Sequence, residues 1–309
     1  MAEDLAKSRL GLAVAALFVA GPVAGQAAAE KPRPEPFRLY VIGASVSGGF
    51  EDGPLTGAEE RGDSVPISSV LKVWVGPIGG RVASFPPLAM QGLFEDPEGI
   101  GEKEIAAAIR SRADLVVGID YLFWFGYGRI RGRSEREERL AKLERGLALL
   151  DRLPGTVLIG TFPDMSGAAP RMLAPSWIPS PGVLDALNAR LGAWAAEHDG
   201  ANGRKGPRVL LFPLGDLVEA MKRDGLDLRV GDTLRRCPPG SLLQGDRLHA
   251  NRLGMAWLGF RIQEFVRESL GADHPLSRPS LSLEQFADAI SAAGDLEALS
   301  PAKETARGG

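Results

Sequence analysis

The chain has 309 residues, of which 44% are hydrophobic and 24% charged, and its formal net charge is -3. This balance supplies enough apolar surface for a folded core and excludes a wholly disordered protein. The small net charge favours neither a nucleic-acid partner nor binding to an anionic membrane surface. A single cysteine, Cys237, excludes an intramolecular disulfide, and with only three histidines beside it the sequence argues against a zinc site. We therefore expect no cofactor and no bound metal.

The first 29 residues have the pattern of a secretory signal peptide. Lys7 and Arg9 precede an apolar run over residues 10–23, and Ala27-Ala28-Ala29 supplies an Ala-x-Ala cleavage site. The run is shorter than the ~20 residues that span a bilayer. We expect a periplasmic or secreted protein with no stable membrane span once the signal is cleaved. An uncleaved anchor is the alternative, because two acidic residues precede the positive flank.

Short apolar runs, typical of buried strands, recur along the rest of the chain. The first covers residues 37–42, and the others lie at 82–90, 113–117, 156–162 and 209–212. Between them, segments 134–153, 183–198 and 252–270 carry apolar residues at helical spacing. Strands that alternate with helices predict a mostly parallel five-stranded sheet with helices on both faces. We expect this domain to occupy residues 30–274, and residues 275–309 to form a tail with one short helix.

A serine follows the first predicted strand directly, in the segment Gly43-Ala44-Ser45-Val46. In open parallel sheets the ligand site lies beyond the carboxyl ends of the strands, which is where this turn falls. Small neighbours let a substrate carbonyl approach both the hydroxyl and the nearby backbone N–H groups. A purely structural turn has the same composition, so Ser45 by itself does not indicate chemistry.

Asp246 and His249, just ahead of the last predicted helix, supply the partners that such a serine needs. A serine hydroxyl becomes a good nucleophile when a base takes its proton, and an imidazole does so near neutral pH. A carboxylate three residues before the histidine can fix the tautomer of the ring and stabilise the imidazolium that forms. His198 and His274 lack such a partner in the sequence and fit surface or capping roles.

The order of these motifs resembles that of the SGNH (GDSL) hydrolase family, over roughly residues 37–269. Gly43-Ala44-Ser45-Val46 is similar to the Gly-Asp-Ser-Leu block of the family, and Asp246-x-x-His249 is similar to its closing block. The resemblance implies a three-layer α/β/α flavodoxin-like fold and hydrolysis of a small-molecule or polysaccharide ester. It implies an acyl-enzyme on Ser45, with His249 as base and Asp246 as the partner that orients it.

The middle of the chain departs from this family pattern. The family has Gly-x-Asn-Asp after the third strand, with the Asn amide donating into the oxyanion hole, whereas this chain has Gly118-Ile119-Asp120-Tyr121. An ionised carboxylate repels a developing oxyanion. Three alternatives stay open: a protonated Asp120, another donor, or a degenerate site. Gly92 is the best candidate for the oxyanion glycine, so Gly92, Gly118 and Asp120 are the expected oxyanion and substrate residues.

Two further segments have alternative roles. The aromatic cluster at residues 121–127 fits either an apolar acyl or aryl pocket or burial against the helices. Phe162-Pro163-Asp164, after the fourth strand, fits a turn better than a border of the cleft. The leading functional hypothesis is an exported serine esterase. The alternatives are a non-catalytic α/β binding domain with a degenerate oxyanion site, and an O-acetyl esterase or acyltransferase that acts on a cell-envelope carbohydrate.

Overall fold

The computed structural model describes residues 36–53, 61–132, 134–199 and 206–301. The chain divides into two units, Met1–Glu35 and Pro36–Gly309, and everything described belongs to the second. The signal peptide predicted at residues 1–29 therefore lies outside the described residues. Within the described ranges, no helix is both long enough and apolar enough to cross a membrane.

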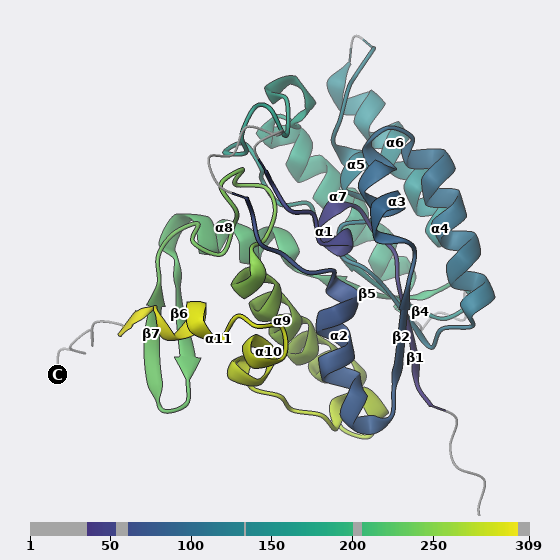
Figure 1. The fold of residues 1–309 in the computed structure, drawn as a ribbon. Helices are drawn as coiled ribbons and strands as arrows, with labels where there is room; N and C mark the ends of the chain where they lie inside the picture. Colours follow the sequence, from purple (N-terminus) through teal and green to yellow (C-terminus); the bar gives the residue numbers. More distant parts are fainter. Residues whose placement is uncertain (1–35, 54–60, 133, 200–205, 302–309) are drawn as a thin grey trace, which may run out of the picture. The chain divides into compact units, whose positions relative to one another are not determined.

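Five parallel strands form the centre of the second unit, in the order β2-β1-β3-β4-β5 (Figure 1). This order is that of flavodoxin-like folds, and the parallel five-stranded sheet predicted from the sequence is confirmed. The predicted run 82–90 ends early as a strand because Pro86 and Pro87 cannot donate to a ladder, and the short helix α3 (Pro87–Gln91) follows. The strands are β1 (Arg38–Val41), β2 (Arg81–Ser84), β3 (Leu115–Gly118), β4 (Thr156–Gly160) and β5 (Arg208–Phe212).

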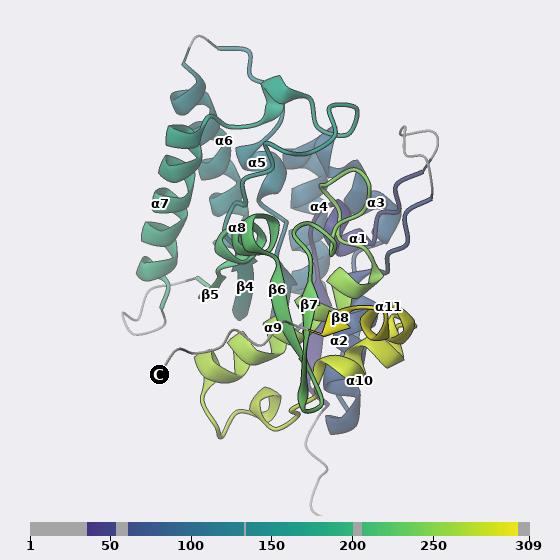
Figure 2. The ribbon, with the colours of Figure 1, turned by 90° about the vertical axis from the view of Figure 1, so that its left-hand side faces the viewer.

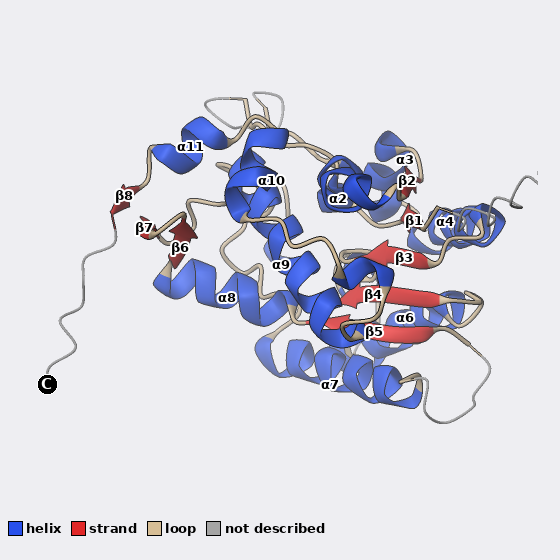
Figure 3. Ribbon diagram, turned by 90° about the horizontal axis from the view of Figure 1, so that it is seen from below, coloured by secondary structure: helices blue, strands red, loops and turns tan. Residues whose placement is uncertain are grey.

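Helices cover both faces of the sheet, because successive residues of each strand point to opposite sides. Leu39 and Val41 belong to the core shared with α2 (Ile67–Val75) and α9 (Arg252–Leu270). Tyr40 and Ile42 belong to the core on the other face, covered by α4 (Pro97–Ser111), α6 (Glu135–Leu150) and α7 (Pro181–Glu197). Figure 3 shows α2 and α9 on one side of the sheet and α6 and α7 on the other. The three-layer α/β/α prediction is thus confirmed.

Residues 275–301 are folded against the domain, which differs from the tail expected beyond residue 274. After η5 (Pro275–Ser277), the helices α10 (Leu283–Ala289) and α11 (Ala293–Glu297) bury Phe286 and Leu296 in the core shared with α2 and α9. The strand β8 (Ser300–Pro301) then pairs with the hairpin of β6 (Leu226–Val230) and β7 (Thr233–Cys237). Figure 2 shows this small antiparallel sheet beside α10 and α11.

Short helical elements gather at the carboxyl edge of the central sheet. After β1 comes α1 (Ser45–Gly48), after β2 come α3 and η3 (Gly92–Phe94), and after β3 comes α5 (Phe123–Gly126). A loop with η4 (Pro175–Trp177) follows β4, and α8 (Leu214–Asp224) follows β5. The remaining short helix, η2 (Gly76–Ile78), instead connects α2 to the start of β2. Residues far apart in the sequence therefore meet at the edge where open parallel sheets bind ligands.

Candidate active site

Ser45, His249 and Asp246 meet at this carboxyl edge. Oγ of Ser45 lies 2.7 Å from Nε2 of His249, although 204 positions of sequence separate the two residues. Nδ1 of His249 lies 2.5 Å from Oδ2 of Asp246. The imidazole and the carboxylate are buried, whereas the serine is half-buried. The two distances are those that a nucleophile, its base and the orienting group of that base require.

The turn that carries Ser45 depends on glycine. The chain leaves β1 through Gly43, whose φ is +148°, and a Cβ there would lie 2.3 Å from Oδ1 of Asp120. Only glycine fits such a backbone and such a close approach. The single helical turn α1 then begins at Ser45 and is capped by Gly49, which has a left-handed φ of 70° and donates its N–H to the carbonyls of Ser45 and Val46. The serine is therefore the first residue of a short, closed turn.

Asp246 organises the loop that carries His249. Its Oδ1 accepts the backbone N–H groups of Leu248 and His249, at 2.9 and 3.0 Å, while Oδ2 faces the imidazole. Burial raises the pKa of Asp246, but the hydrogen bonds and charge of His249 and the backbone N–H groups outweigh burial and hold the pKa below its usual value. An ionised carboxylate only accepts hydrogen bonds, so Nδ1 carries the proton and Nε2 is left to accept from Ser45.

An apolar pocket of about 80 Å³ adjoins Ser45. Residues after β1, β3, β4 and β5 contribute to it, together with the side chains of α8, α9 and the loop before α9. Its apolar walls include Met165, Leu214, Met221, Leu242, Leu248 and Trp257. Such a lining, with Ser45 and Asp120 as its polar members, is typical of a site for a small apolar group.

The aromatic cluster at residues 121–127 is divided between the apolar pocket and the core. Phe123 lines the pocket, whereas Tyr121, Phe125 and Tyr127 are buried in the core beneath α4, α6 and α7. Pro163 lines the pocket as well, so the segment after β4 borders the site in addition to forming a turn. The sequence could not separate these roles because consecutive residues of a one-turn helix face different surroundings.

Asp120 lies beside α1, the turn that carries Ser45, and accepts hydrogen bonds from it. Its Oδ2 accepts the N–H groups of Val46 and Ser47 at 2.9 and 3.1 Å, and its Oδ1 lies 2.5 Å from Oγ of Ser47. Burial raises the pKa of Asp120, while the hydrogen bonds from the turn oppose that rise. The residue was expected at the oxyanion site. It does line the pocket, but its oxygens anchor the first N–H groups of α1.

The two glycines expected at the oxyanion site are not among the described residues that line the pocket. The N–H of Gly92 donates to the carbonyls of Ala89 and Met90 and so closes the end of α3. Gly118 is the last residue of β3, and a Cβ there would lie 2.9 Å from Cγ1 of Ile42, so close packing explains this glycine. The N–H of Gly92 is therefore engaged at the end of α3, and the role expected of Gly118 stays a prediction.

Glu104 of α4 is a buried residue of the site that the sequence reasoning missed. Its Oε2 accepts the N–H of Gly43 at 3.1 Å, and the side chain is fully buried. Burial above all, with a contribution from the charge of Asp120, raises its pKa to about 9 against the opposing hydrogen bond from Gly43. Glu104 shares the buried face of α4 with Gly101, Ile105 and Ala108. A carboxylate at that position of the helical repeat is the signal that could have found it.

Replacing Glu104 by glutamine is expected to stabilise the protein at neutral pH. The pKa of this carboxyl group rises from 4.5 to about 9 on folding, so folding takes up a proton and wild-type stability falls as the pH rises through that window. The neutral amide avoids this loss, with a gain of about 3 kcal/mol at pH 7. Urea unfolding of Glu104→Gln between pH 5 and pH 9 measures the gain, which should grow with pH. Glu102→Gln, at an exposed position of the same helix, is the control; equal curves for the two variants contradict the prediction.

Comparisons with known proteins add little to this geometry. No protein-family model and no curated protein matches the chain. Among solved structures, the chain is similar to a Clostridium thermocellum family 3 carbohydrate esterase, with 10% identity and a TM-score of 0.41. The match covers 76% of this chain and 98% of that chain. At this level of likeness, the function has to be inferred from the chain's own site.

Proposed function

We propose that this protein is an exported serine hydrolase of the SGNH type that cleaves carboxylic esters. The observation that carries the proposal is the unbroken series of hydrogen bonds from Ser45 Oγ through the imidazole of His249 to the buried carboxylate of Asp246. Export is supported by the signal-peptide pattern of residues 1–29. The apolar pocket beside the hydroxyl supplies a place for the acyl group.

The reaction follows from the positions of these atoms. Nε2 of His249 takes the proton of the Ser45 hydroxyl as Oγ forms a bond with the carbonyl carbon of the ester. The bond between that carbon and the alcohol oxygen then breaks, and His249 returns the proton to the departing alcohol. Water attacks the acyl-enzyme in the second half, with the same proton transfers, and releases the carboxylic acid and free Ser45.

The oxyanion needs a donor close to Ser45. The N–H groups of Val46 and Ser47 are taken by Asp120. We assign the N–H of Ser45 to this role, because the first N–H groups of a helix have no acceptor within the helix. This assignment replaces the side-chain amide that the SGNH pattern has at the position of Asp120.

The size of the pocket limits the acyl group. Its volume of about 80 Å³ is roughly half that of an apolar cavity that holds a benzene ring, about 150 Å³. Acyl chains of about two to four carbons therefore fit, whereas longer chains exceed this volume. We propose short-chain acyl esters as the substrate class, with the alcohol part outside this pocket.

A non-catalytic binding domain is the second candidate, and the position of Asp120 favours it. A carboxyl group on the wall of the pocket, with its oxygens turned toward Val46 and Ser47, offers a developing oxyanion no donor. In that case the same pocket binds a small apolar ligand without turnover.

A serine-reactive phosphonate and a series of aryl esters separate the two candidates. We expect the purified protein to take up one phosphonate at Ser45, located by mass spectrometry of the peptides. Acetyl to butyryl esters should be turned over at least about tenfold faster than octanoyl esters. The reason is that a single CH₂ group that the pocket cannot accommodate lowers kcat/KM by roughly tenfold or more. Absence of both labelling and turnover contradicts the hydrolase and favours the binding domain.

A further inference from the structure

We infer that Gln244 is a positioning residue that joins two segments of the site. One is the segment at residues 50–52, which follows the nucleophile turn at Ser45, and the other is the base loop at residues 244–250, which carries His249. The inference rests on the proposed function. Gln244 lies two residues before Asp246 and is buried, with 6% of its surface exposed. It is not among the described residues that line the pocket. Its role therefore has to come from the main-chain groups that its side chain joins.

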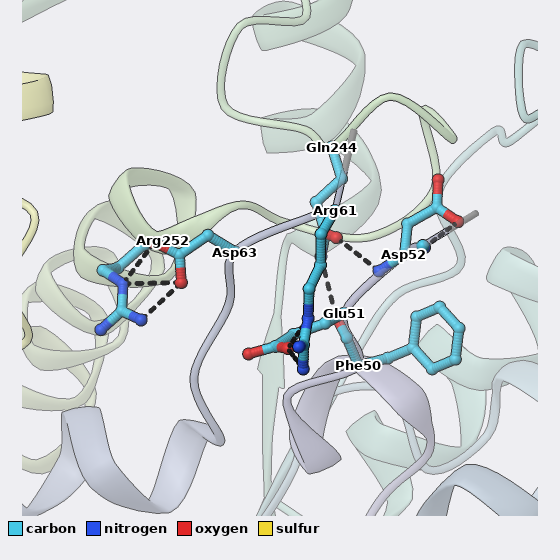
Figure 4. A network of polar contacts seen from close by, with 8 residues as sticks. Phe50, Glu51, Asp52, Arg61, Asp63, Gln244 and Arg252 are labelled. Carbon is cyan, nitrogen blue, oxygen red and sulfur yellow. Dashed lines mark hydrogen bonds and ion pairs between the residues drawn. The ribbon is translucent and has the colours of Figure 1, made fainter. Parts of the chain in front are cut away.

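The side-chain amide of Gln244 uses both of its ends. Nε2 donates to the carbonyl oxygens of Phe50 and Ala250, at 2.7 and 2.9 Å. Oε1 accepts the N–H of Asp52 at 2.8 Å. Figure 4 shows this side chain between the segment that follows the nucleophile turn and the base loop. One amide thus bridges two segments that lie almost 200 positions apart in the sequence, with separations of 194 and 192 positions for its contacts to Phe50 and Asp52.

These bridged segments contact the side chains of the proposed reaction or lie next to them. The N–H of Phe50 donates to the carbonyl of Ser45 at 3.0 Å. The ring of Phe50 packs on the imidazole of His249, with the ring centroids 4.4 Å apart. On the other side, Ala250 directly follows His249, and the backbone N–H of Gln244 donates to the carbonyl of His249 at 2.8 Å. A shift of either segment therefore changes the distance between Ser45 Oγ and His249 Nε2.

The surroundings of the amide leave it no other orientation. A Cβ at Gly62 would lie 1.7 Å from Oε1 of Gln244, so that glycine packs directly against the amide. The N–H of Gly62 donates to the carbonyl of Asp52 at 2.6 Å. This bond holds Asp52, the residue whose N–H donates to Oε1 of Gln244. The ion pairs Arg61–Glu51 and Arg252–Asp63, also drawn in Figure 4, lie at the exposed margin of the same network and contribute little by comparison.

Only an amide of this length satisfies all three main-chain groups. Two carbonyls need donors and one N–H needs an acceptor, which matches the inventory of a glutamine side chain. Leucine removes all three of these hydrogen bonds. Glutamate has the same shape, but it places an acceptor against the carbonyls of Phe50 and Ala250. With either substitution, we expect the distance between Ser45 Oγ and His249 Nε2 to vary more than in the wild type. A misplacement of reacting groups by about 1 Å lowers the rate by up to about a hundredfold.

The chain offers a matched control at Gln263 of α9. This glutamine is also buried, and its amide also bridges main-chain groups: Oε1 accepts the N–H of Leu281 at 3.0 Å and Nε2 donates to the carbonyl of Leu281 at 2.8 Å. It contacts neither the nucleophile turn nor the base loop through these bonds. Gln263→Leu therefore reproduces the loss of a buried amide bridge without disturbing the site.

The test compares Gln244→Leu and Gln244→Glu with Gln263→Leu in the full chain. With a short aryl ester, kcat of both Gln244 variants should fall about 10- to 100-fold while KM stays within about twofold, because Gln244 itself is not among the described residues that line the pocket. Gln263→Leu should lower the melting temperature but keep the wild-type kcat. If Gln244→Leu does not fold, the isosteric Gln244→Glu carries the comparison. Wild-type kcat in a folded Gln244 variant, or an equal loss in Gln263→Leu, overturns the inference.

A second readout separates this inference from the proposed function. The proton between His249 Nδ1 and Asp246 should appear as a low-field proton NMR resonance, observable without substrate. We expect it in the wild type and in Gln263→Leu, and expect it broadened or shifted in the Gln244 variants. A wild type that shows the resonance but turns over no ester contradicts the hydrolase alone. An unchanged resonance in the Gln244 variants contradicts the bridge, whatever the activity.

Discussion

Replacing Ser45 by alanine is expected to lower kcat for short aryl esters by at least about a thousandfold. In the proposed reaction the hydroxyl bonds to the substrate carbon, and its Oγ lies 2.7 Å from Nε2 of His249. His249→Ala is expected to cost as much, because without the base the hydroxyl keeps its proton. The double variant should be no slower than either single one, since the two residues act as a unit. Steady-state kinetics of the three purified variants measure these losses.

The control for these variants is His198→Ala. His198 is another buried histidine beside a carboxylate, with its Nε2 3.2 Å from Oδ1 of Asp151, and it is not among the described residues that line the pocket. Its removal should lower stability and leave kcat unchanged. Wild-type rates in Ser45→Ala or His249→Ala would show that the three aligned residues do not perform the reaction.

Asp120 carries the second large expected effect, and it differs between two substitutions. Asp120→Ala removes the acceptor for the N–H groups of Val46 and Ser47 and the partner of the Ser47 hydroxyl, so it should cost about 2–6 kcal/mol of stability. Asp120→Asn keeps an oxygen for the N–H groups and turns an N–H donor toward Ser47. Urea unfolding at pH 7 should therefore place Asp120→Asn close to the wild type and Asp120→Ala far below it.

The same pair of variants tests the effect of the charge on catalysis. Burial raises the pKa of Asp120, so the wild-type carboxyl group ionises at a higher pH than an exposed one, and its charge then opposes both folding and a developing oxyanion. The amide cannot ionise. We expect Asp120→Asn to keep its activity and to extend it toward higher pH, as measured by the pH profile of kcat/KM. A loss as deep as that of Asp120→Ala at every pH would mean that the carboxylate itself is needed.

The sequence was most informative where short-range patterns decide structure. Runs of apolar residues and helical spacings predicted the five strands and α6, α7 and α9, because periodicity records which face of an element is buried. The spacing of Asp246 and His249 predicted their contact, since one loop brings such neighbours together. The order of strand, serine and closing motif then placed Ser45 at the correct edge of the sheet.

The remaining parts of the fold and site depend on contacts between distant segments. The burial of Phe286 and Leu296 required the faces of α2 and α9 as partners, so the expected tail is part of the core. Gly92 was a reasonable oxyanion candidate from its position after a strand, but the local end of α3 uses its N–H. No pattern in the chain predicted the small antiparallel sheet, because β8 is only two residues long and pairs with a hairpin more than sixty positions away.

The sequence by itself therefore determined the residue types and the order of Ser45, Asp246 and His249, which are those that the proposed hydrolase needs. Only the tertiary structure decided what surrounds them. Asp120 accepts the N–H groups of Val46 and Ser47, which lie 74 and 73 positions away in the sequence. Glu104 accepts the N–H of Gly43, which lies 61 positions away. A hydrogen bond between distant residues depends on how the layers pack, and no local period in a sequence records that.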